Sequence, residues 1–121
     1  MKSILIVDDE ANIRRLYSEE LADAGYRVVC AGSWQEAQRA LDAGSFDLVT
    51  LDIRMGDGPD GIEALRLIKD RHPGLPVVLV TAYEEYQADF ASWAAEGYVV
   101  KSSDLTELKG RIARELAKAT P

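Results

Sequence analysis

Short runs of consecutive apolar residues alternate along this chain with longer stretches in which apolar residues recur every three or four positions. An uninterrupted apolar run is typical of a strand buried on both faces, and the longer spacing is typical of an amphipathic helix. We expect strands over residues 3–7, 26–31, 46–51, 77–80 and 98–100. We expect helices over residues 10–24, 33–44, 83–95 and 104–117, and a further helix that opens at Asp60. The chain therefore repeats a strand–helix unit five times.

Glycines and one capping box set the ends of the first two helices. Gly25 follows the first helical stretch at the position where a helix commonly ends in a left-handed residue, a conformation that glycine adopts with little strain. Ser33 and Glu36 have the spacing of a capping box, which predicts that the second helix begins there. Gly44 is the expected end of that helix.

Five such units, joined by crossovers of roughly 10–15 residues, predict an α/β fold with a five-stranded parallel sheet and helices on both faces. The strands at 3–7, 46–51 and 77–80 are the most apolar and should lie in the middle of the sheet. The strands at 26–31 and 98–100 are more polar and should lie at its edges. The expected strand order is 2-1-3-4-5, that of a flavodoxin-like (βα)5 three-layer sandwich, in which the winding reverses between the first and third strands.

Length and composition narrow the class of protein. At 121 residues the chain is expected to be one domain over residues 1–121, and its net charge of −7 argues against direct binding of nucleic acid. No apolar run approaches the ~20 residues that span a bilayer, so no membrane association is expected and a cytoplasmic location fits. Cys30, the single cysteine, lies in an apolar run and is expected to be an inert, buried thiol.

Polar residues stand where the expected strands finish. Asp8 and Asp9 follow the first strand, Asp52 the third, Thr81 the fourth and Lys101 the fifth. Parallel strands end at the same edge of a sheet, and open α/β sheets place their sites there. Three carboxylates in one place repel each other, and a divalent cation relieves the repulsion, with Mg²⁺ preferring such hard oxygen ligands. We therefore predict a magnesium site with room for a phosphoryl group.

Each of these residues also has an ordinary structural explanation. Asp8 or Asp9 alone is more often a helix cap, and a lone Asp52 is often a loop residue. Thr81 begins a capping box, and Lys101 taken singly is a solvated surface lysine. The functional interpretation depends on their shared position at the same end of four expected strands.

Four segments, Val7–Glu10, Leu51–Met55, Thr81–Ala82 and Tyr98–Lys101, resemble the receiver domain of two-component response regulators. The resemblance runs from about Lys2 to Ala117. It implies that the protein is a signalling domain and not an enzyme, apart from self-phosphorylation and autodephosphorylation at one aspartate. It also implies that a sensor histidine kinase or a phosphotransfer protein is the phosphoryl donor.

The resemblance further implies a role for each residue of the site. Asp52 would be the phosphoacceptor, and Thr81 and Lys101 would each contact a phosphoryl oxygen. The metal, Mg²⁺ or Mn²⁺, would be ligated by Asp9, Asp52 and the backbone carbonyl of Arg54, and Asp8 would act through a metal-bound water. Tyr98 would follow the movement of Thr81 in the switch.

The resemblance also implies a structural consequence of phosphorylation. The face made by the helix at 83–95, the strand at 98–100 and the helix at 104–117 would switch and bind a partner. That partner would be a downstream effector protein or an output domain outside this chain. A phosphorylation-dependent homodimer is a further expectation, and Trp93 could border the output surface.

Two loops depart from the family pattern. Ser102 stands where the family usually has a proline after the lysine, and because a cis bond there would cost ~3–4 kcal/mol we predict a trans Lys101–Ser102 bond. The stretch Gly56–Gly61 looks one residue long and lacks the usual proline after Met55. Asp57 in that stretch is expected to be a solvated loop residue.

Three other classes of protein compete with this interpretation. A flavodoxin-like electron carrier would need a phosphate cradle after the first strand, where Asp8, Asp9 and Glu10 would repel the phosphate of FMN. A magnesium-dependent phosphatase with a nucleophilic aspartate would need a cap domain or substrate pocket. A receiver that binds partners without being phosphorylated would not require the full set of site residues.

Overall fold

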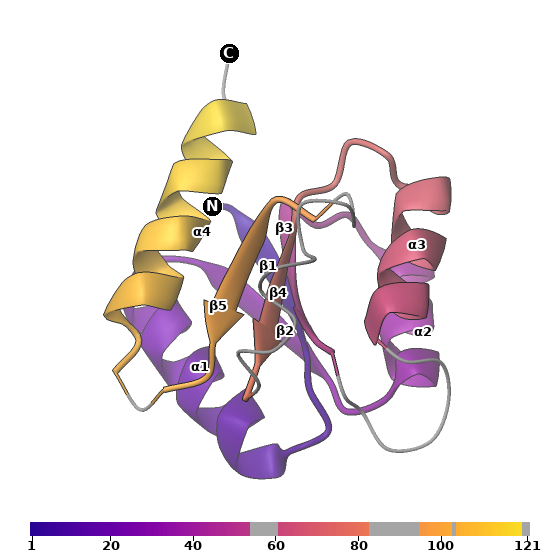
Figure 1. Ribbon diagram of the computed structural model, residues 1–121. Helices are drawn as coiled ribbons and strands as arrows, with labels where there is room; N and C mark the ends of the chain where they lie inside the picture. Colours follow the sequence, from indigo (N-terminus) through magenta and orange to yellow (C-terminus); the bar gives the residue numbers. More distant parts are fainter. Residues whose placement is uncertain (54–60, 83–94, 103, 120–121) are drawn as a thin grey trace.

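Five parallel strands form one sheet in the order β2-β1-β3-β4-β5 (Figure 1). The computed structural model describes residues 1–53, 61–82, 95–102 and 104–119. The strands are β1 (Ser3–Val7), β2 (Arg27–Ala31), β3 (Leu48–Asp52), β4 (Val77–Thr81) and β5 (Gly97–Val100). The described helices are α1 (Ala11–Asp23), α2 (Trp34–Ala43), α3 (Gly61–Arg71) and α4 (Thr106–Ala119). The predicted α/β class, strand order and parallel pairing are confirmed. The helix expected over 83–95 lies outside the described residues, except for Ala95.

Helices cover both faces of the sheet, with α1 and α4 on one side and α2 and α3 on the other (Figure 1). Strand β1 contributes side chains to the core on both faces of the sheet, because successive side chains of a strand point to opposite faces. Ile4 and Ile6 pack with residues of α1 and α4, whereas Leu5 and Val7 pack with residues of α2 and α3. All of β1 is buried, as a central strand of a parallel sheet requires.

Strand β3 begins and ends later than the sequence predicted. Asp47, the residue before β3, is hydrogen-bonded to the start of β1. The Ser3 amide donates to Asp47 Oδ2 at 2.7 Å, and the Asp47 amide donates to the Ser3 carbonyl at 2.8 Å. The pairing of Asp52 with Val80 makes Asp52 the last residue of β3 and not the first residue after it. Thr81 is likewise the last residue of β4.

Two of the expected helix-end signals are present. Ser33 caps α2, with its hydroxyl accepting a hydrogen bond from the Glu36 amide at 3.2 Å. Gly25 has a φ of 98°, the left-handed conformation expected at the end of the first helix. The prediction that Cys30 is buried was wrong, because this residue is exposed. The apolar run that contains it forms β2, which is an edge strand and is only partly covered.

Polar contacts close the amino-terminal edge of the sheet between α3, β4 and β5. Lys69 Nζ lies 2.6 Å from Glu96 Oε1 and donates to the Leu75 carbonyl at 2.7 Å. The same carboxylate accepts from the Val77 amide at 2.8 Å. This half-buried cluster ties the start of β4 to the residue that precedes β5.

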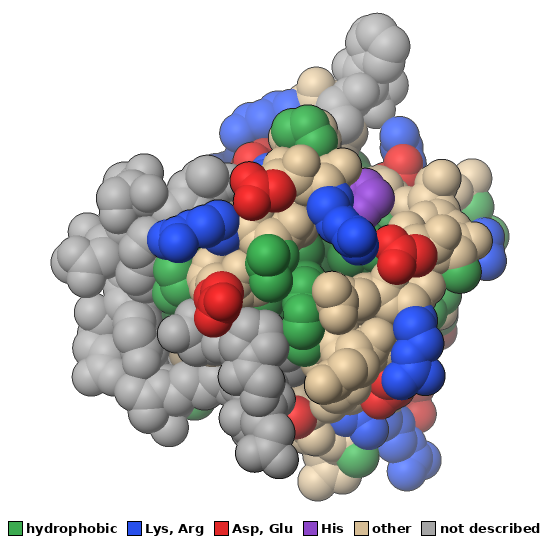
Figure 2. Space-filling model, turned by 90° about the vertical axis from the view of Figure 1, so that its right-hand side faces the viewer, with side chains coloured by type: hydrophobic (Ala, Val, Ile, Leu, Met, Phe, Trp, Pro, Cys, Tyr) green, Lys and Arg blue, Asp and Glu red, His purple; other side chains and the backbone are tan. Residues whose placement is uncertain are grey.

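A hollow of about 320 Å³ lies between α2 and α3. Figure 2 shows this side of the molecule, where apolar side chains are surrounded by charged ones. The residues that line the hollow are Trp34, Gln38, Leu41, Leu67, Ile68, Asp70, Arg71 and His72. None of them belongs to the predicted site, whose residues lie at the carboxyl ends of the strands. Within the described ranges, no helix is both long and apolar enough to cross a bilayer.

Candidate functional site

Strand register brings the predicted site residues to one edge of the sheet. The pairing of β1 with β3 makes Asp8 and Asp52 the next positions on adjacent strands. The pairing of β3 with β4 places Thr81 directly after the partner of Asp52, and the pairing of β4 with β5 places Lys101 directly after the partner of Thr81. The four residues therefore meet because of the fold, although they are far apart in the sequence.

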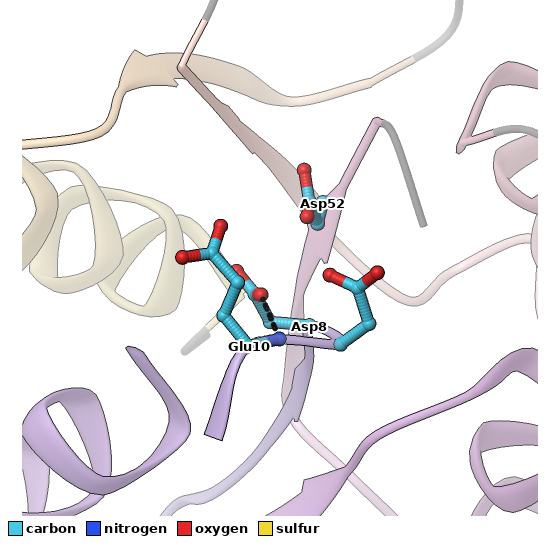
Figure 3. A group of neighbouring side chains, drawn as sticks. Asp8, Glu10 and Asp52 are labelled. Carbon is cyan, nitrogen blue, oxygen red and sulfur yellow. Dashed lines mark hydrogen bonds between the residues drawn. The ribbon is translucent and has the colours of Figure 1, made fainter. Parts of the chain in front are cut away.

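One ammonium lies among three carboxylates in this site. Lys101 Nζ is 3.0 Å from Asp8 Oδ2, 3.2 Å from Asp52 Oδ2 and 3.0 Å from Glu10 Oε1. Asp8 and Asp52 are buried, at 2% and 4% exposure, and the Lys101 side chain is 11% exposed. Figure 3 shows Asp8 and Glu10, from the segment after β1, on the same side of the molecule as Asp52 at the end of β3.

A tight turn after β1 aims the acidic side chains. The Asp8 amide continues the sheet by donating to the Ala31 carbonyl at 3.1 Å, and Asp8 Oδ1 accepts from the Glu10 amide at 2.9 Å (Figure 3). Arg14 Nη1 donates to the Asp8 carbonyl at 2.9 Å. Aspartate readily bonds the backbone two residues on, which ends the strand and turns the chain into α1. Because of this turn, the carboxylates of Asp8, Asp9 and Glu10 lie close together beside the end of β3.

Four carboxylates of the site suit a divalent cation. Asp8, Asp9, Glu10 and Asp52 each offer one oxygen, and these oxygens all lie within 4.8 Å of one another. Carboxylate oxygens in this number are the hard donors that Mg²⁺ and similar cations take, and a cation would offset their mutual repulsion. Arg54, whose carbonyl was expected to complete the ligand set, lies outside the described residues.

Glu10 is a member of this cluster to which the sequence alone assigned no role. Its carboxylate is the same distance from Lys101 as that of Asp8. The only sequence signal was a third consecutive acid after the first strand, at Val7–Glu10. A third acid at the start of a helix is ordinarily explained by a favourable interaction with the helix dipole.

Thr81 and Tyr98 occupy the positions expected of them in the sheet. Thr81 is fully buried, and its backbone carbonyl accepts from the Lys101 amide at 2.6 Å. Tyr98 is 4% exposed and belongs to the core layer beneath α2 and α3. The expected coupling between the two side chains remains a prediction.

Burial and the ion pairs shift the protonation equilibria of the site. Burial raises the pKa of the Asp8 carboxyl above its ordinary value of 3.8, although the Glu10 amide and the Lys101 ammonium act in the opposite direction. Burial alone would lower the pKa of Lys101, but its hydrogen bonds to Asp8 and Glu10 and the charge of Asp52 outweigh burial and raise that pKa. Lys101 is therefore a permanent cation of the site at neutral pH.

Asp8→Asn is expected to stabilise the metal-free protein at neutral pH. A carboxyl with a raised folded-state pKa favours folding below its unfolded-state value, near 3.8, and this contribution is lost as pH rises through the folded-state pKa. The amide does not ionise, so the variant should be more stable by up to about 1 kcal/mol above that range and equal to wild type at lower pH. Urea unfolding in EDTA across a pH series measures the difference.

The control for this experiment is Asp42→Asn, at an exposed carboxylate that pairs with Arg71 at 3.2 Å. Exposed pairs contribute little, so its unfolding curve should follow wild type at every pH. Equal stability of wild type and Asp8→Asn at neutral pH would contradict the proposed cost of burying the Asp8 charge.

Comparison with known proteins assigns the chain to a family. The family described as "Response regulator receiver domain" matches residues 4–113. The chain belongs to this family. Regulatory protein AtoC of Escherichia coli K12 is 38% identical to the receiver domain over 115 residues, which are 93% of this chain and 25% of AtoC. The transcriptional regulator NtrC of the same organism is 33% identical over 116 residues, 94% of this chain and 24% of NtrC. The receiver domain thus spans about a quarter of the length of these curated relatives.

Solved structures of receiver domains have the same fold. The response regulator TrrA of Thermotoga maritima, in complex with Mg²⁺-BeF, is 43% identical with a TM-score of 0.88, over 95% of this chain and 99% of TrrA. TrrA in complex with the histidine kinase ThkA is 44% identical with a TM-score of 0.87, over 96% of this chain and 99% of TrrA. The resemblance to receiver domains of two-component systems is confirmed, and the electron carrier and the phosphatase are set aside.

The remaining expectations about the loops divide between described and undescribed residues. The described backbone contains no cis peptide bond, so the predicted trans Lys101–Ser102 bond is confirmed. The Ser102 hydroxyl accepts from the Asp104 amide at 3.1 Å, and Asp104 in turn accepts from the Thr106 amide at 3.0 Å at the start of α4. The expectations for Gly56–Asp60 and Trp93 lie outside the described residues.

Proposed function

We propose that this receiver domain is a phosphorylation switch in which Asp52 accepts a phosphoryl group from a phosphohistidine. The observation that carries the proposal is the placement of the Asp52 carboxylate, buried at the sheet edge among cation-binding carboxylates and 3.2 Å from Lys101 Nζ. The donor is a sensor histidine kinase or a phosphotransfer protein. This assignment is supported by the relative TrrA, which forms a complex with the histidine kinase ThkA.

The metal is proposed to be Mg²⁺, or Mn²⁺ in its place, held by Asp9, Asp52 and the Arg54 carbonyl with Asp8 acting through water. The TrrA structure with Mg²⁺-BeF supports this choice, as does the acidic cluster. When bound, the cation would supply positive charge to the phosphoryl oxygens. Phosphoryl transfer depends mainly on such positioning and charge neutralisation.

The residues of this chain supply the remaining chemistry. An Asp52 carboxylate oxygen attacks phosphorus, the bond between phosphorus and the donor imidazole breaks, and its electron pair leaves with the imidazole. The Lys101 ammonium stabilises the negative charge of one phosphoryl oxygen, and the Thr81 hydroxyl donates a hydrogen bond to another. Attack by water on the aspartyl phosphate reverses the change, which makes autodephosphorylation part of the proposal.

The consequence of phosphorylation is proposed to be a change at the face formed by residues 83–95, β5 and α4. Phosphorylation adds charge and three acceptor oxygens, which draw Thr81 and Lys101 inward. Tyr98, which lies on β5 opposite Leu79 of β4, would follow the movement of Thr81. The receiver domain would then bind an effector protein, an output domain or a second copy of itself, and a cytoplasmic location fits this role.

Acetyl phosphate and Mg²⁺ test the proposal without knowledge of the kinase. Incubation is expected to add the mass of one phosphoryl group to the intact protein, and EDTA is expected to prevent the addition. The adduct should disappear with time once acetyl phosphate is removed. Absence of any adduct over a full range of Mg²⁺ concentrations would contradict the proposed function and would favour a receiver that binds partners without phosphorylation.

A further inference from the structure

Lys101 has more acidic partners than its proposed role requires. An ammonium has three donor hydrogens, and Lys101 has one carboxylate partner for each of them, in Asp8, Glu10 and Asp52. Asp8 and Asp52 belong to the proposed metal site. Glu10 is the one partner of the three with no proposed metal or phosphoryl contact.

Two cations therefore depend on the same oxygens. A divalent cation at the acidic cluster and the Lys101 ammonium both draw on Asp8 and Asp52, and their like charges repel. If Asp8 and Asp52 were the only partners of Lys101, entry of the cation would leave this largely buried ammonium without a free acceptor. A charge in that position is costly unless it keeps a partner. Glu10 is the acceptor that stays available.

The backbone on both sides fixes this contact. The Glu10 amide donates to Asp8 Oδ1 at 2.9 Å and its carbonyl accepts from the Arg14 amide at 3.1 Å, so Glu10 is held at the start of α1. The Lys101 amide is held by the Thr81 carbonyl at 2.6 Å. The two side chains meet between these anchors across 91 residues of sequence.

Stability alone does not explain the pair. The Glu10 side chain is 59% exposed, and an ion pair with one partner so exposed contributes little to the free energy of unfolding. Because Glu10 lies beside the site, its carboxylate can instead affect the charges there. It sets where the ammonium rests and adds one negative charge to the cluster.

We propose that Glu10 is a positioning residue that holds the Lys101 ammonium beside the acidic cluster, so that a divalent cation can use Asp8 and Asp52 while Lys101 remains poised for the phosphoryl group. The proposal rests on the proposed function. It predicts that removing the Glu10 carboxylate weakens cation binding through Lys101, since an ammonium without Glu10 competes harder for Asp8 and Asp52.

Glu10→Gln is expected to weaken Mg²⁺ binding about fivefold, a change in keeping with the loss of one nearby, partly screened charge and of its contact. Backbone amide chemical shifts followed during titration with Mg²⁺ alone give the affinity without any phosphodonor. Glu19→Gln is the matched control, because it removes the same charge from α1 at a residue that pairs with Arg15. Its affinity for Mg²⁺ should equal that of wild type.

A double-mutant cycle with Lys101→Met tests whether Glu10 affects Mg²⁺ binding through its contact with Lys101 or only through its own negative charge. Lys101→Met should bind Mg²⁺ more tightly than wild type, and Glu10→Gln should have a clearly smaller effect in that background. An equal effect in both backgrounds, or no effect in either, would overturn the proposal while leaving the proposed function intact. Failure of wild type to bind Mg²⁺ at all would instead overturn the proposed function.

Discussion

Asp52→Asn is expected to abolish phosphoryl transfer to this protein while leaving its fold intact. The amide has nearly the shape of the carboxylate but is not a nucleophile at phosphorus, and loss of a nucleophile typically lowers the rate by at least about a thousandfold. Of the four clustered carboxylates, Asp52 is the one at the end of β3, between β1 and β4 in the sheet. The other three follow β1. Intact mass after incubation with acetyl phosphate and Mg²⁺ should show no adduct.

Two observations make this result specific to Asp52. Asp42→Asn, at an exposed residue of α2 that pairs with Arg71, should be phosphorylated as wild type is. The amide spectrum of Asp52→Asn should remain that of the folded protein, because Lys101 keeps Asp8 and Glu10 as partners. A phosphoryl adduct on Asp52→Asn at the wild-type rate would move the nucleophile to another residue.

Gly61→Ala is expected to cost about 3 kcal/mol of the free energy of unfolding, at the upper end for an overpacked position. A Cβ on Gly61 would lie 2.7 Å from the Ile53 carbonyl oxygen and 2.8 Å from that of Asp52, and closer still to Ile53 Cα. These are backbone atoms, which do not turn aside as a side chain does. The Gly61 amide also donates to the Ile53 carbonyl at 2.6 Å, so the close approach holds the start of α3 against the end of β3.

Urea unfolding measures this loss, and Gly110→Ala supplies the control. A Cβ on Gly110, within α4, would meet nothing within 4 Å. The same substitution should there raise stability by about 0.5–1 kcal/mol, because alanine favours the helix. If Gly61→Ala were also neutral or stabilising, the tight packing of α3 on the end of β3 would be contradicted. A displaced β3 end should also slow phosphorylation of Asp52 in Gly61→Ala.

The arrangement of the sheet could be predicted because it depends on local patterns. Continuous apolar runs identified the three central strands, and their stronger apolar character relative to β2 and β5 predicted the strand order. Buried parallel strands must be apolar on both faces, and this requirement leaves a clear trace in the sequence. The ends of β3 and β4 were less well predicted, since hydrogen bonding across the sheet extends a strand into polar residues.

Burial at the edge of the sheet was harder to predict. Cys30 lies among the apolar residues of β2, but the edge position of this strand leaves the residue exposed. The hollow between α2 and α3 had no sequence signal either, because it depends on how two helices approach each other. Both features arise from packing between elements, which the period of a single element does not report.

The sequence by itself determined which residues stand at the strand ends, and hence that Asp8, Asp52, Thr81 and Lys101 share one edge. Strand direction and order were sufficient for that conclusion. Only the tertiary structure decided how the charges pair. Glu10 and Lys101 are 91 residues apart, and their contact at 3.0 Å depends on a turn after β1 and on the direction of two side chains. Periodicity fixes the position of a residue along an element, whereas the direction of a long, flexible side chain depends on the charges that the fold assembles around it.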